Sequence, residues 1–236
     1  NTTGTYNVSV GAYSADALTT GSQNVAIGHA ALGSDTKGSK SIAIGESALF
    51  NQNFTSATDT FNVAIGENAG TSVTTGVNNT LIGGLAGDAL TDADFNVAIG
   101  MQALSADTLG SRSVAIGLEA LATQNFTSAT NTYNVAVGAG AGQAVTTGVN
   151  NTLIGGLAGD SLTTGTDNDA IGVSALASDT RGNRSTAIGR GALNSQNFTS
   201  ATSVYNVAVG YLAGLSVTTG IGNTLIGGLA GDALTD

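Results

Sequence analysis

One five-residue motif, Asn-Val-Ala-Ile-Gly with small variations, recurs along the whole 236-residue chain. Its closing glycines follow a 17-residue period in which every fourth interval is a 21-residue one, and four intervals make a 72-residue super-repeat. These motif glycines are Gly11, Gly28, Gly45, Gly66, Gly83, Gly100, Gly117, Gly138, Gly155, Gly172, Gly189, Gly210 and Gly227. No linker separates the repeats. A fixed period of this kind indicates a solenoid, in which each repeat packs against its neighbours.

The residues around the motif glycine form columns when the repeats are aligned. The residue before the glycine is always Ile or Val, and the one before that is Ala or Leu except at Ser9. The third residue before it is Val, Ile or Thr, with Asp169 as an exception that the pattern leaves unexplained. Such β-branched residues favour strands, and glycine permits a sharp bend. A second turn signal, Thr-Thr-Gly or Asp-Thr-x-Gly, follows half a repeat later.

Two short strands and two turns account for a 17-residue coil, and the chain lacks the helical apolar pattern. The sequence therefore predicts an all-β fold, a parallel β-solenoid or β-roll of about thirteen coils. Stacking at about 4.8 Å would place Ile27, Ile44 and Ile65 in single file and let Asn side chains bond along their column. We expect one β-solenoid repeat domain over residues 1–236, a fragment of a longer fibre protein.

Adjacent residues of a strand point to opposite faces, yet the Ile column and the Ala or Leu column are both apolar. A 17-residue coil encloses one thin interior, to which we assign the Ile column. The small side chains of the other column would then let a neighbouring chain approach closely. This pattern predicts a homotrimer, and the alternative is a monomer whose outer Ala column faces water.

Charge and composition exclude several classes of function. Six basic residues stand against sixteen acidic ones, for a net charge of −10. Such a surface would repel the phosphates of a nucleic acid. No apolar stretch is long enough to span a bilayer, and the absence of cysteine excludes disulfides and thiolate metal sites. We expect no nucleic-acid partner and no membrane insertion.

The chain has few of the groups that catalysis requires. His29, the single histidine, follows a motif glycine and is expected at a surface turn. The glycine-rich phrase Ile82–Asp88 lacks the Lys-Ser/Thr ending of a phosphate-binding loop. Asp88 recurs only every fourth coil, about 19 Å apart, which is too far for two carboxylates to share an ion. The sequence predicts no catalytic, cofactor-binding or metal site, and hence no enzyme.

Basic residues gather in the equivalent coil of each super-repeat, beside an aspartate. They are Lys37, Lys40, Arg112, Arg181 and Arg184, beside Asp35, Asp107 and Asp179. This arrangement predicts a ring of exposed ion pairs that contributes little to stability. A cationic contact for a glycan or a lipid is the alternative.

The 21-residue coils share the phrase Gln-Asn-Phe-Thr-Ser-Ala-Thr, at Gln52–Thr58, Gln124–Thr130 and Gln196–Thr202. Four extra residues must bulge from the stack, because the columns resume in register afterwards. Each bulge carries a phenylalanine, Phe54, Phe126 or Phe198, and forms a candidate surface-contact loop. Either the ring packs over a neighbouring chain as a staple, which we favour, or it is an aromatic platform for a sugar.

The motif at Asn24–Gly28, Asn62–Gly66 and Asn96–Gly100 resembles the head repeats of trimeric autotransporter adhesins, which are left-handed parallel β-rolls assembled as homotrimers. The longer phrase Ile-Gly-x-x-Ala-Leu-x-x-x-Thr-x-Gly is more similar to repeats of bacteriophage and marine-virus tail-fibre shafts. Adhesin heads generally have shorter coils than the 17-residue coil of this chain and no regular 21-residue coil. The resemblance therefore implies a homotrimeric shaft that carries or contributes to a receptor-binding end.

Taken together, these patterns predict a structural fibre protein, located outside the cell as a virion tail fibre or on a cell surface. Its partners would be copies of itself and a host-cell surface glycan or receptor. The first alternative is a bacterial adhesin head of the autotransporter type that binds matrix or glycans. The second is an ice-binding solenoid, an activity that requires Thr columns on a flat sheet. Here the Thr column lies beside glycine at a turn and is interrupted at Asn53, Asn125 and Asn197, so the flat regular face is missing.

Overall fold

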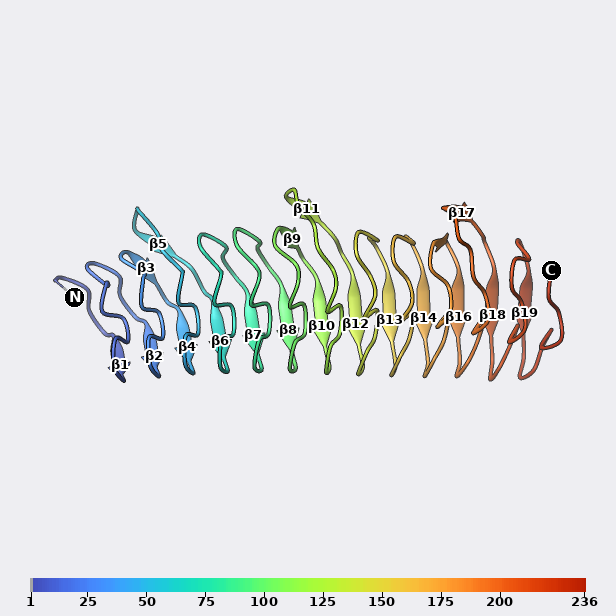
Figure 1. Cartoon of the computed structure of the whole chain (residues 1–236), viewed down its shortest axis with the longest axis horizontal. Helices are drawn as coiled ribbons and strands as arrows, with labels where there is room; N and C mark the ends of the chain where they lie inside the picture. The colour runs from blue at the N-terminus through green and yellow to red at the C-terminus, as the bar shows by residue number, and fades with distance from the viewer. Residues whose placement is uncertain (1) are drawn as a thin grey trace. The chain divides into compact units, whose positions relative to one another are not determined.

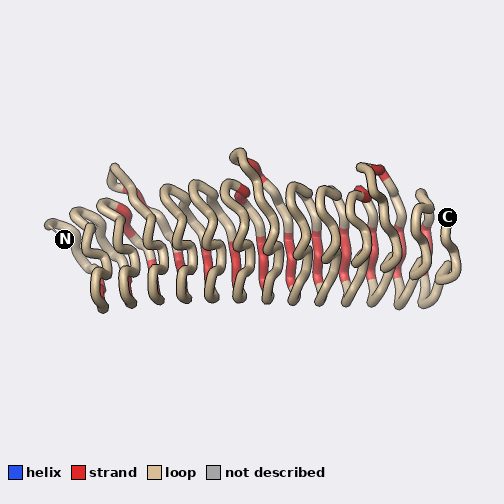
Figure 2. The backbone as a smooth tube through the Cα atoms, viewed as in Figure 1, coloured by secondary structure: helices blue, strands red, loops and turns tan. Residues whose placement is uncertain are grey.

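The computed structural model describes residues 2–236, so Asn1 of the expected domain lies outside the described part. The chain divides into two compact units. The first contains the residues up to Ser113 together with Asn125–Asn131, and the second contains Val114–Gln124 and Thr132–Asp236. Every regular element among residues 2–236 is a β-strand (Figure 2). That the two units make up a single domain stays a prediction.

Each coil contributes one three-residue strand, and the strands of a unit form a parallel sheet in the order of the sequence (Figure 1). In the first unit they are β1 (Val8–Val10), β2 (Val25–Ile27), β4 (Ile42–Ile44), β6 (Val63–Ile65), β7 (Thr80–Ile82) and β8 (Val97–Ile99). In the second they are β10 (Val114–Ile116), β12 (Val135–Val137), β13 (Thr152–Ile154), β14 (Asp169–Ile171), β16 (Thr186–Ile188), β18 (Val207–Val209) and β19 (Thr224–Ile226). Ile27 pairs with Ile44 and Ile44 with Ile65, so the predicted single file is confirmed. The fold is the predicted parallel β-solenoid of about thirteen coils.

Within the described chain, second strands occur only where a 21-residue coil meets the coil before it, so the expectation of two strands in every coil is wrong. The pairs are β3 (Gly38–Ser39) with β5 (Thr58–Asp59), β9 (Gly110–Ser111) with β11 (Thr130–Asn131), and β15 (Gly182–Asn183) with β17 (Thr202–Ser203). Figure 1 shows β5, β11 and β17 on arms that reach beyond the neighbouring coils of their units. The rest of each coil is turn, with several residues in left-handed backbone conformation.

The interior is built from the small side chains, which corrects the assignment of the Ile column to the inside. In β4, Ala43 is fully buried, whereas Ile42 and Ile44 on either side of it face outward and are half-exposed. Other strands repeat this pattern, with Ala or Leu buried at their centre. The closed coil also encloses a second Ala and a Leu from the turn, such as Ala48 and Leu49. That leaves too little space for a column of Ile.

In this interior, a leucine from one position fills the space that glycine leaves at another. Leu81 replaces the central Ala of β7, and its methyl groups occupy the space that Gly70 and Gly87 leave in the turns of the two nearest coils. A Cβ atom on Gly70 would lie 2.6 Å from Leu81 Cδ1, and one on Gly87 would lie 2.8 Å from Leu81 Cδ2. Most other coils carry Leu at the turn position and Ala in the strand. Each layer is therefore packed to similar volume, as close packing requires.

A largely buried ladder of Asn residues joins the coils just before most of the three-residue strands, and Ser41, Ser113 and Ser185 hold this position before β4, β10 and β16. Asn62 Oδ1 accepts the main-chain N–H of Asn79 at 2.9 Å, while Asn62 Nδ2 donates to the carbonyl of Gly76 at 2.7 Å. The same two bonds recur at Asn24 and Asn168. The predicted bonding along the Asn column is confirmed, with the main chain of the next coil as the principal partner. These bonds satisfy polar groups that would otherwise be buried without partners.

Candidate functional site

The candidate site features are a buried polar cluster, paired aromatic and cationic side chains beside the arms, and two extended surfaces. The buried cluster lies beneath the arm of the first 21-residue coil. Gln52 Nε2 donates to Asp35 Oδ2 at 2.6 Å and to Ser41 Oγ at 2.9 Å, and Gln52 Oε1 accepts from Asn62 Nδ2 at 2.9 Å. All four side chains are fully buried or nearly so. The same contacts join Gln196 to its equivalents in the second unit.

The burial of Asp35, Asp107 and Asp179 overturns the expected ring of exposed ion pairs. Asp35 Oδ1 accepts the main-chain N–H of Gly38 at 2.9 Å and of Phe54 at 3.3 Å, so main-chain donors stabilise this carboxylate in place of lysine. Lys40 instead forms a salt bridge of 2.6 Å with Asp59 on the arm. The sequence placed acidic and basic residues side by side but carried no sign that one of them points inward.

The three phenylalanines of the candidate contact loops are also buried. Phe54 and Phe126 are each 7% exposed and Phe198 is 8% exposed within their own chain. The arm of the same chain covers the rings, so they form neither the favoured staple over a neighbouring chain nor an exposed platform for a sugar. What the arm exposes is its tip, residues 55–57, whose side chains form no hydrogen bond within the described chain. That these loops contact a partner stays a prediction.

In each unit, exposed aromatic and cationic side chains pair beside the arms. Lys40 lies 5.0 Å from the ring centre of Phe61, and Arg184 lies 5.7 Å from that of Tyr205. Arg112 stacks in the same way on Phe95. Each such exposed pair contributes about 0.5–1 kcal/mol. These pairs therefore add modestly to stability and leave the ring edges accessible to solvent.

The first extended surface is the outer face of the sheet, which we call the sheet face. It consists of the first and third residues of the three-residue strands, almost all Val, Ile or Thr and mostly half-exposed. Among the described strands, Asp169 is the one charged residue in these columns, and it is exposed at the start of β14 between Thr152 and Thr186. The outward direction of this column explains why a charge is accepted there, since water solvates it.

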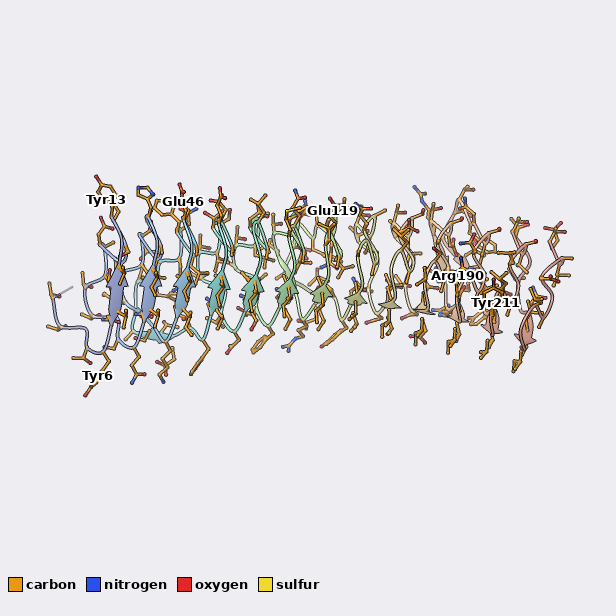
Figure 3. All side chains as sticks on the ribbon, turned by 90° about the horizontal axis from the view of Figure 1, so that it is seen from below. Tyr6, Tyr13, Glu46, Glu119, Arg190 and Tyr211 are labelled. Carbon is orange, nitrogen blue, oxygen red and sulfur yellow. The ribbon has the colours of Figure 1, made fainter. Side chains whose placement is uncertain are left out.

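The second surface is the corner that follows each strand, formed by the first, second and fifth residues after the motif glycine. In the first unit Tyr13 and Glu46 project from this edge, and Tyr6 projects from the opposite one (Figure 3). His29 lies here too, exposed as expected, with Nδ1 3.9 Å from Glu46. In the second unit the corner holds shallow grooves, of which one is floored by Ala139, Gly140 and Gly156. A second lies beside Arg190 and Tyr211, which stack on each other.

Two equivalent aspartates near this corner are the groups whose pKa burial alters most. Desolvation raises the pKa of Asp88 and of Asp160 above the ordinary value of 3.8. One oxygen of each, Oδ1, is buried and accepts no hydrogen bond. Asp92 behaves in the opposite way, because hydrogen bonds from Thr75 and Thr74 lower its pKa. The ionised form is therefore disfavoured at Asp88 and Asp160 and favoured at Asp92.

These directions predict how stability depends on pH. A raised pKa means that the folded chain binds the proton more tightly than the unfolded chain does. As pH rises from 3.8 through the raised pKa, the free energy of unfolding therefore falls. The double variant Asp88→Asn/Asp160→Asn should therefore be more stable than the parent at pH 7. We expect about 1 kcal/mol or less per site, since both side chains are partly solvated. At pH 3 the gain should vanish.

Thermal unfolding followed by circular dichroism at pH 3 and pH 7 measures this difference. Asp92→Asn is the matched control with the opposite sign, and it should be less stable than the parent at pH 7 and equal to it at low pH. A double variant less stable than the parent at pH 7 would contradict the assignment of the raised pKa.

Within residues 2–236 there is no group of three or more His, Cys, Asp or Glu side chains that could hold a metal ion. The same residues include no helix with the length and hydrophobicity to cross a bilayer. The chain matches no family model, and no curated protein or solved structure is detectably similar to it.

Proposed function

We propose that this chain is a structural segment of an extracellular fibre that assembles with copies of itself, and that it is not an enzyme. The shaft of a viral tail fibre is the form that the sequence resemblance favours, and its role is to contribute to attachment to a host surface. The sheet face is the observation that carries the proposal. A parallel sheet normally has both of its faces covered, and here the interior covers only one.

The repeat of the sheet face supports the proposal that its partner is another copy of the chain. Covering the exposed third of a Val or Ile side chain contributes about 0.5–1 kcal/mol. One coil presents two such side chains, so a single coil cannot offset the cost of association, which is about 4–15 kcal/mol. The six strands of the first unit together can. A copy in parallel register presents the same spacing along its whole length, and we propose a homotrimer as the assembled form.

The arms are the part of the chain suited to contact a host glycan or receptor. Their exposed tips, 55–57, 127–129 and 199–201, have the same sequence Thr-Ser-Ala in all three super-repeats. The Thr column does not favour the ice-binding alternative, because its hydroxyl groups are engaged within the chain. Thr19 Oγ1 donates to the carbonyl of Thr36, and Thr91 Oγ1 donates to that of Thr108.

Molar mass in solution tests the proposed assembly. The parent chain is expected at three times its mass of 22.9 kDa by light scattering. The variant Ile44→Lys/Ile82→Lys places two charges on the sheet face, where both side chains are half-exposed, and should yield folded monomer because burying unpaired charges at an interface is costly. A parent chain that remains monomeric at all concentrations would overturn the proposal.

The matched control is Gln23→Lys/Asn78→Lys. It adds the same two charges to the column in which Lys40 already occurs, away from the sheet face. This variant should assemble like the parent. If it dissociates as readily as the sheet-face variant, net charge and not the covered face controls assembly.

A further inference from the structure

The residues of the corner surface differ between the three super-repeats in three of the four coils and are the same in the fourth. In the other coils the residue after the motif glycine differs in every copy. It is His29, Met101 and Val173 in one coil, Glu46, Leu118 and Arg190 in the next, and Glu67, Ala139 and Tyr211 in the third. In the fourth coil of all three super-repeats the triplet of first, second and fifth residues is Gly, Leu and Asp. These register triplets are Gly84–Leu85–Asp88, Gly156–Leu157–Asp160 and Gly228–Leu229–Asp232. The partial repeat at the start of the chain departs from them, with Ala12 and Tyr13.

The chain's own fold does not require glycine at the first position of the triplet. A Cβ atom added to Gly84 or Gly228 would have no atom within 4 Å, and one added to Gly156 would lie 3.9 Å from the Ala139 carbonyl oxygen. None of the three has a left-handed backbone that would exclude other residues. Elsewhere this position holds side chains as large as Arg190 and Tyr211. The recurrence of glycine at this position is therefore attributed to a contact outside the coil.

Leucine at the second position is costly for the isolated chain. Leu85 is 36% exposed, Leu157 46% and Leu229 51%, so each leaves much of an apolar side chain in water. Their left-handed backbone, with φ between 58° and 61°, is shared by this position in every coil and so does not set the triplets apart. The exposed Leu beside an open Gly forms an apolar projection next to a recess.

The third member has incomplete hydrogen bonding in two of the three triplets. Oδ1 of Asp88 and of Asp160 is buried without a donor, and nearly all buried polar atoms in folded proteins have one. In the second unit the Gly156 recess opens into a groove of about 400 Å³ walled by Leu118, Leu157 and Val173. The lining is mostly apolar or small, with Glu119 and Gln143 as its polar members, and such a lining allows close approach of another chain.

We propose that the register triplets are contact sites for a second copy of this chain and set the axial register between copies. This inference rests on the proposed self-assembly. A partner must present matching features once every four coils, a spacing of about 19 Å between Gly156 and Gly228 in the second unit. A copy of the chain meets this requirement, because it carries the same triplets at the same spacing. A threefold assembly needs two different patches on each chain. The sheet face and the corner adjoin along the motif glycines, so one chain can offer both.

The test replaces the three glycines together, as Gly84→Gln/Gly156→Gln/Gly228→Gln. Since the added Cβ atoms meet open space or an ordinary contact within the chain, circular dichroism and thermal unfolding of the dilute variant should match the parent. Association should weaken by about tenfold or more, because extra atoms in a packed contact are poorly tolerated. Light scattering over a dilution series measures the midpoint. The matched control, Glu46→Gln/Met101→Gln/Arg190→Gln, changes the same position in three coils that carry no triplet and should leave the midpoint unchanged.

A second measurement reports the register itself. The chain has no cysteine, so Ser56→Cys places a single spin label on an exposed arm tip. Pulsed electron resonance on the assembled parent should give one narrow distance between labels on different copies. In the triple Gln variant the distribution should broaden, because copies can slip by coils of about 4.8 Å.

Three outcomes are distinguishable. Weaker association or a broadened distance in the triple Gln variant, with an unchanged control, supports the register triplets. A triple variant that assembles with the affinity and the narrow distance of the parent overturns them and leaves the proposed fibre assembly intact. A monomeric parent overturns the assembly and the triplets with it.

Discussion

Replacing Gly66 with alanine is expected to lower the free energy of unfolding by about 3–5 kcal/mol. The φ angle of Gly66 is 137°, a backbone region that residues with a β-carbon rarely adopt. The new Cβ atom would also lie 2.5 Å from the carbonyl oxygen of Gly83 and 2.6 Å from its carbonyl carbon. Because main-chain atoms of the next coil cannot move away singly, the two coils would have to separate. Urea denaturation followed by circular dichroism measures the loss.

Gly84→Ala is the matched control, one coil further along the same corner. Its Cβ atom would meet nothing within 4 Å of the same chain, so the stability of the dilute, dissociated chain should be unchanged or slightly increased by the smaller entropy of the unfolded chain. If Gly66→Ala proved as stable as Gly84→Ala, the close stacking of motif glycines would be refuted. In a solenoid the damage should spread to neighbouring coils, since each is stabilised by the next.

Replacing Gln52 with alanine should cost about 3–5 kcal/mol. The side chain donates to Asp35 and Ser41 and accepts from Asn62, all of them buried. Its removal leaves Asp35 Oδ2 without its amide donor in a place that water does not reach. An uncompensated buried carboxylate oxygen is costly, and the shortened side chain also leaves a cavity. The midpoint of urea unfolding reports the change.

Gln23→Ala is the control for this variant, because Gln23 is exposed and its side chain forms no hydrogen bond in the described chain. It should change stability by about 0.5 kcal/mol or less. Gln196→Ala should reproduce the Gln52 effect in the second unit, where the same three bonds recur. Equal stability of Gln52→Ala and Gln23→Ala would show that the buried cluster contributes nothing.

The arms illustrate how far sequence reasoning reached at the candidate site. Four extra residues in a coil that resumes its register must project, and β5, β11 and β17 do project. The burial of Phe54 was not predictable from the phrase that contains it. Its ring is covered because its own N–H is anchored on Asp35, which lies in the preceding coil and is itself held by Gln52. Nothing in the spacing of charged residues marks Asp35 as an inward-facing group.

The repeat by itself determined the stacked architecture and its register. A residue that lies on its own copy in the next coil makes the same favourable contact each time, so the period alone places Ile27 beside Ile44 and Ile44 beside Ile65. The bonding of Asn62 to the next coil follows from the same repetition. The stacking register and the bonds between successive coils depend only on the repeat period, which can be read directly from the sequence.

Only the tertiary structure decided which side of each strand is the inside. Alternation along a strand separates Ala43 from Ile44 but does not say which of them is enclosed. That choice depends on the volume a closed coil can hold once Ala48, Leu49 and the Leu81 of another coil are counted together. Small residues occupy the strand positions of the interior because side chains from the turns already fill most of it. The larger Ile and Val side chains therefore lie on the outer face, which a partner can cover.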